Sequence, residues 1–78
     1  MMNNKVNEMN IQTIAENLRN TIKGKEQLLA LYAERAELGT YPKTLEYRGM
    51  CAMLEIEITD LERILQDLEQ CIELQQTA

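Results

Sequence analysis

The chain has 78 residues, enough for one domain and no more. It contains no His and two Cys, which excludes the commonest general base and a cysteine–histidine zinc site. The net charge is −5, and Lys and Arg nowhere cluster as a duplex-binding surface requires, so we expect no direct nucleic-acid binding. Charge is uneven: residues 1–43 carry six Lys or Arg against five Glu, whereas residues 44–78 carry two Arg against eight Asp or Glu.

Residues 1–9 are polar and rich in Asn, and we expect them to form a flexible tail. They lack the apolar run of a signal peptide, and no apolar stretch is long enough to predict a membrane span. Cys51 and Cys71 fall on one predicted helix about 30 Å apart, too far for an intrachain disulfide. Free cysteines are typical of a reducing compartment, so the sequence predicts a cytoplasmic protein.

The first predicted helix covers residues 11–38. Either Asn10 caps its start, or Thr13 and Glu16 form a capping box. Eight residues recur along this helix at alternating steps of four and three, which places them on one face. All of them except Lys25 are apolar. This first half of what we call the seam comprises Ile11, Ala15, Leu18, Ile22, Lys25, Leu29, Tyr32 and Ala36.

A turn is predicted at residues 39–42, because Gly39 follows the last apolar residue and Pro42 cannot continue a helix. The second predicted helix covers residues 43–74, and a polar tail follows at 75–78. It carries the second half of the seam, Tyr47, Cys51, Leu54, Ile58, Leu61, Leu65, Leu68 and Ile72. Position numbers taken from opposite ends of the two halves always sum to 83. The pattern therefore predicts an all-α, coiled-coil-like antiparallel hairpin.

Each helix is apolar over a wider face than one partner helix covers. The first adds Ile14, Leu28 and Leu31, and the second adds Met50, Met53, Ile64 and Cys71. A lone two-helix hairpin also buries little surface against the entropy of its chain. We therefore expect a homodimer in the form of a four-helix bundle, or a higher oligomer.

Lys25 is the one charged seam residue, placed opposite Ile58. Two arrangements are open. A buried lysine can hold an anionic ligand or a partner's carboxylate and set the register of the bundle. Alternatively, its stem lies on the seam while the ammonium reaches water near Glu57.

The turn gathers the only cluster of aromatic and basic residues. Its members are Arg35, Tyr41, Lys43, Tyr47 and Arg48. A helix N-terminus with two cations nearby favours an anion, so a nucleotide could bind here with its base on a tyrosine. The alternative is an ordinary turn in which Tyr47 belongs to the seam.

The second helix also carries a stripe of acidic residues. Glu55, Glu62, Glu69 and Glu73 recur at steps of seven, seven and four, and we expect them to face away from the seam. They form either a docking surface for a basic protein or a solvated face that supports solubility.

One local resemblance is to an enzyme family. The run from Leu18 to Arg35, about twenty residues with Arg19, Ile22 and Leu28–Leu31, resembles the first helix of the all-helical chorismate mutases. The resemblance implies a mutase-like enzyme as a third function, but Gly39 and Pro42 end the helix early and no third helix follows, so no catalytic role is assigned to the arginines. The hairpin is also similar in architecture to the plasmid-encoded Rop dimers.

No catalytic motif, metal site or cofactor site is recognisable in the sequence. The sequence favours a small non-enzymatic protein that binds another protein as a regulator, adaptor or inhibitor, acting as a homo-oligomer. Compact acidic chains of this kind are typical of accessory or mobile-element products. The alternative is an oligomeric binder of a small anionic ligand at the turn.

Overall fold

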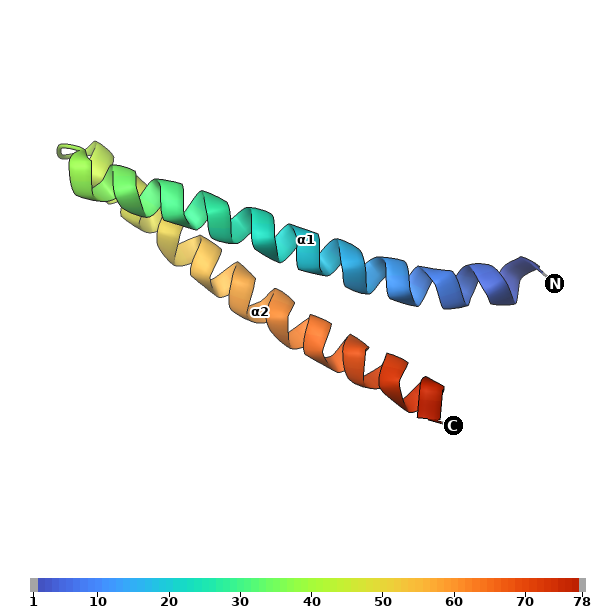
Figure 1. Cartoon of the computed structure of the whole chain (residues 1–78). Helices are drawn as coiled ribbons and strands as arrows, with labels where there is room; N and C mark the ends of the chain where they lie inside the picture. The colour runs from blue at the N-terminus through green and yellow to red at the C-terminus, as the bar shows by residue number, and fades with distance from the viewer. Residues whose placement is uncertain (1, 78) are drawn as a thin grey trace.

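A computed structural model of the chain shows two long helices packed as an antiparallel hairpin (Figure 1). The structure describes the backbone of residues 2–77 and the side chains of residues 11–76. Helix α1 spans Met2–Leu38 and helix α2 spans Lys43–Thr77, so both termini lie at the end away from the turn. The predicted all-α hairpin is confirmed.

Helix α1 begins upstream of the two N-cap positions that the sequence suggests. No Gly or Pro precedes residue 11, so the backbone meets no strong helix breaker there. The side chains of residues 1–9 lie outside those described, and the flexibility of this segment stays a prediction. The residues predicted as a polar tail after residue 74 continue helix α2, which extends to Thr77.

The seam is the core of the hairpin. All sixteen seam residues are buried or half-buried, and among the other described side chains only Thr44 shares that property. The most buried are Ala15, Ile22, Ala36, Leu54 and Ile58. Near the turn, the rings of Tyr32 and Tyr47 lie 5.7 Å apart between centroids, and the Cys51 thiol lies 4.0 Å from the Leu29 carbonyl oxygen.

The turn is held by backbone hydrogen bonds. The Gly39 amide donates to the Arg35 carbonyl at 2.8 Å and closes the last turn of α1. The Pro42 carbonyl accepts from the amides of Leu45 and Glu46, and so satisfies two of the first amides of α2. A Cβ at Gly39 would lie 2.8 Å from the Arg35 carbonyl oxygen, which explains why glycine occupies this position.

The hairpin is a rod of 58 × 21 × 13 Å. Its radius of gyration is 17.5 Å, whereas a globular chain of this length has about 11.5 Å. Over the described part of the chain, neither helix is apolar enough over a sufficient length to cross a bilayer.

Candidate functional site

The positions of the seam residues distinguish the two long sides of the hairpin. In antiparallel helices, residues that directly precede a seam position lie on one side of the pair, and residues that directly follow one lie on the other. The contacts agree with this geometry. Arg19 and Glu69 both follow a seam residue, and they form an ion pair across the helices at 2.7 Å.

The preceding side carries many of the exposed apolar side chains of the hairpin. Six large apolar residues that directly precede a seam residue are between 40% and 65% exposed, and Cys71 is exposed beside them. These six define what we call the apolar side: Ile14, Leu28, Leu31, Met50, Met53 and Ile64. Polar residues such as Asn17, Asp60 and Asp67 lie among them. Exposed apolar residues are common singly, but a group on one side marks an interaction surface.

An ion pair interrupts the apolar side near its middle. The Lys25 ammonium lies 3.2 Å from a Glu57 carboxylate oxygen on the other helix. The two side chains are 30% and 46% exposed, so the lysine stem contributes to the seam while its charge reaches the surface. This is the second of the two arrangements that the sequence left open for Lys25.

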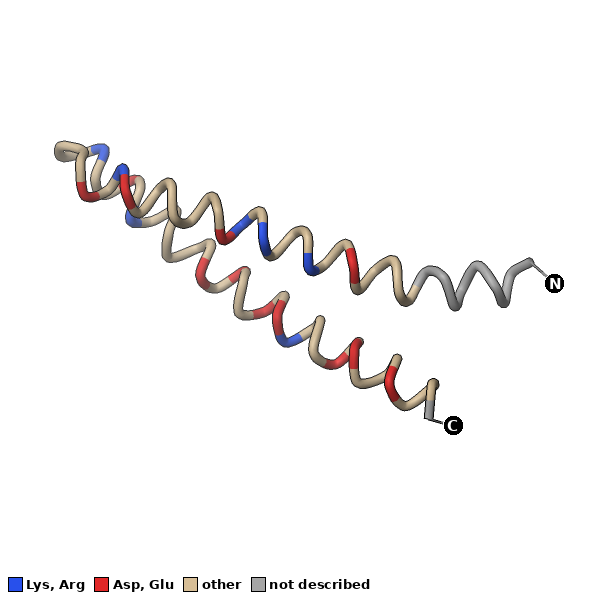
Figure 2. Tube along the Cα trace, viewed as in Figure 1, with Lys and Arg blue, Asp and Glu red and all other residues tan. Residues whose placement is uncertain are grey.

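The following side carries the acidic stripe. Figure 2 shows acidic residues recurring along α2. Glu55, Glu62, Glu69 and Glu73 each directly follow a seam residue, so they share one side as expected. The expectation that they face away from the seam is wrong for Glu69, whose carboxylate accepts two hydrogen bonds from Arg19 of α1. The stripe therefore flanks the seam, because a step of seven fixes a common face but not the angle of that face.

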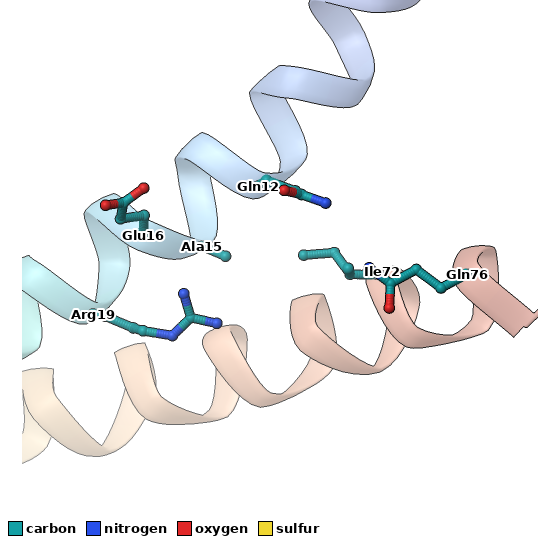
Figure 3. Close-up of a pocket in the computed structure, with 6 residues that line it drawn as sticks. All are labelled: Gln12, Ala15, Glu16, Arg19, Ile72 and Gln76. Atoms are coloured by element: carbon teal, nitrogen blue, oxygen red, sulfur yellow. The ribbon is translucent and has the colours of Figure 1, made fainter.

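A hollow of about 280 Å³ opens between the helices near their free ends (Figure 3). It is lined by Gln12, Ala15, Glu16, Arg19, Ile72 and Gln76. Sequence reasoning missed this site, although Gln12, Arg19 and Gln76 are polar residues that flank a seam containing the small Ala15. The Arg19 charge is already balanced by Glu69, so the hollow presents polar groups without a free cation at that residue.

The predicted anion site at the turn is assembled in part. Arg35, Lys43 and Tyr47 line one shallow hollow together with Leu38, Gly39 and Thr40. Tyr41 is 79% exposed and does not line the hollow, and neither does Arg48. Lys43 is also 4.0 Å from Glu46, so its charge is partly balanced in an exposed pair.

Among the described residues, no group of His, Cys, Asp or Glu is arranged to hold a metal ion. No protein-family model, curated protein or solved structure matches the chain.

Proposed function

We propose that the chain is a small non-enzymatic protein-interaction protein that self-associates through its apolar side and offers its acidic side to a basic protein. Such a protein would act as a regulator, adaptor or inhibitor. The observation that carries this proposal is that a row of exposed apolar side chains and the stripe of four glutamates lie on opposite sides of the seam. The two free cysteines support a cytoplasmic location.

The surface area supports self-association. The chain exposes 6400 Å², whereas a folded globular protein of 9.0 kDa exposes roughly 4,900 Å². Its most buried residues are confined to five seam positions, which is a small core for a chain that must offset its conformational entropy. Pairing two hairpins into a four-helix bundle covers the excess surface and enlarges the core.

Sedimentation equilibrium at micromolar concentration tests self-association. We expect a mass of at least two chains. A well-folded monomer with a cooperative unfolding transition at this concentration would contradict the proposal, because the apolar side would then be stable while exposed to water.

The acidic side supports a basic partner. Like charges in a row give the helix no stability, whereas they attract a basic surface over a distance that salt shortens. An affinity matrix carrying the Glu55→Gln/Glu62→Gln variant should retain less basic protein from a lysate than the unmodified chain, and the difference should shrink as salt is raised. The matched control is Glu34→Gln/Glu37→Gln on α1. Equal losses for both pairs would show a general charge effect without a docking surface.

A second candidate function is the binding of a small anion at the turn. The observation in its favour is the shared hollow of Arg35, Lys43 and Tyr47. Calorimetry with a panel of nucleotides should show binding that Arg35→Ala/Lys43→Ala removes and that Arg63→Ala on α2 leaves intact. No heat with any nucleotide would eliminate this candidate.

A further inference from the structure

The apolar side raises the question of what covers it. We propose that its occupant is a second copy of this chain, bound with both turns at the same end of the bundle and with the Lys25–Glu57 pairs of the two copies meeting at the centre. This inference rests on the proposed self-association and specifies its geometry.

The excess surface of the chain is large enough for an interface with a second copy. The chain exposes 6400 Å², about 1,500 Å² more than a folded globular protein of its mass. A stable interface of standard size buries about 800 Å² on each partner. The six residues of the apolar side, exposed by 40% to 65%, lie where a face-to-face pair of hairpins would bury them.

Two face-to-face arrangements obey two-fold symmetry. With the turns at the same end, α1 of one copy lies along α2 of the other at matching levels. With the turns at opposite ends, each helix lies along its own counterpart in reverse. Residues of α1 and α2 whose position numbers sum to about 83 lie at the same level of the rod. This rule determines which residues meet in each arrangement.

Charge separates the two arrangements. With the turns together, Lys25 of one copy lies over Glu57 of the second copy and the reverse, so four charges alternate in sign around the axis. With the turns apart and the ion pairs again at the centre, Lys25 lies over Lys25 and Glu57 over Glu57. A desolvated contact between like charges is costly, so the alternating arrangement is favoured.

The apolar residues are compatible with the turns lying together. In that arrangement Leu31 meets Met53 of the second copy, and the apolar residues near both turns form one cluster. With the turns apart and Glu57 over Glu57, Met50 would meet Ile64, so apolar residues are paired in part there as well. The charges of the central ion pairs therefore decide between the two orientations.

A charge-directed mixing experiment tests the central contact. Lys25→Glu gives an all-acidic centre, and Glu57→Lys gives an all-basic centre. Equal amounts of the two variants, one labelled with ¹⁵N, should form mixed dimers about tenfold more abundantly than either homodimer, as measured by native mass spectrometry. Lys23→Glu mixed with Glu55→Lys, which exchanges charges away from the apolar side, should pair at random.

Random pairing of the first two variants would overturn the inference while leaving self-association intact. A monomeric wild-type chain would instead contradict the proposed function itself. The two failures are therefore distinguishable.

Cross-linking tests the orientation without altering the ion pairs. Both cysteines are replaced by alanine, and a Leu31→Cys chain is mixed with a Met53→Cys chain. With the turns together, the new thiols are neighbours and an oxidant should join the two chains. With the turns apart, the thiols are offset by about 17 Å along the rod and cannot join. Efficient joining of Leu31→Cys to an Asn17→Cys chain instead would establish the opposite orientation and overturn this part of the inference.

Discussion

The polar side chains described in this hairpin are almost all exposed, so a single ion pair contributes little to its stability. The Arg19–Glu69 pair is short, but its side chains are 52% and 44% exposed. An ion pair at such a site is screened by water and salt, and typical exposed pairs contribute about 0–1 kcal/mol. The Arg19–Glu69 pair therefore contributes more to the orientation of α2 against α1 than to the free energy of unfolding.

We expect Glu69→Gln to lower the free energy of unfolding by less than about 1 kcal/mol, with the loss fading as salt is raised. Glu73→Gln is the matched control, because Glu73 lies on the same side and makes no ion pair with any described side chain. Urea unfolding at low and high salt measures both. A loss at Glu69 that persisted at high salt would show that packing of this side chain, and not its charge, is responsible.

At the scale of the helices, two glycines have opposite roles. Gly49 lies inside α2, and a Cβ there would meet nothing within 4 Å. Gly39 lies beyond the end of α1, where a Cβ would lie 2.8 Å from the Arg35 carbonyl oxygen. The first position carries a conformational cost without a structural benefit, and the second requires the absence of a side chain.

Gly49→Ala should therefore stabilise the chain by about 1 kcal/mol and raise its melting temperature by roughly 4–8 °C. Gly39→Ala should destabilise it by about 1–2 kcal/mol, because backbone atoms must move to admit the new methyl group. Thermal unfolding followed by circular dichroism measures the two shifts. Shifts of the same sign would mean that helix propensity alone governs both positions.

The helices also show which features a sequence of this kind reveals. The seam could be predicted because burial follows a strict spacing, and even Lys25 lies half-buried at its seam position. The hollow beside Gln12 and Gln76 could not, since it depends on how far the two helices separate near their free ends. The partial assembly of the turn site depends likewise on side-chain directions around Tyr41, which spacing does not determine.

For the whole molecule, the proposed assembly depends on one side of the rod. Leu31 lies on the apolar side and is 40% exposed, whereas Ile56 lies off it and is 64% exposed. If exposure alone drove association, a substitution of Ile56 would weaken association more than a substitution of Leu31. The proposed interface requires that the Leu31 substitution has the larger effect.

Leu31→Glu should convert the assembly into monomers at micromolar concentration, because a dimer would bury a carboxylate without a partner. Ile56→Glu adds the same charge and should leave the mass unchanged. Sedimentation velocity of the two variants decides the matter, and dissociation by Ile56→Glu alone would place the interface on another face.

The short turn has a consequence for the order in which the chain folds. A contact between Ala36 and Tyr47 closes a loop of about ten residues, whereas one between Ile11 and Ile72 closes about sixty, which costs about 1.5 kcal/mol more in loop entropy. The ring contact between Tyr32 and Tyr47 lies near the turn, where loop closure costs the least entropy. The hairpin should therefore close progressively from its turn, as a zipper does. Amide protection against hydrogen exchange would then decline from the residues beside the turn toward both termini, so the chain ends would open many times for each global unfolding event.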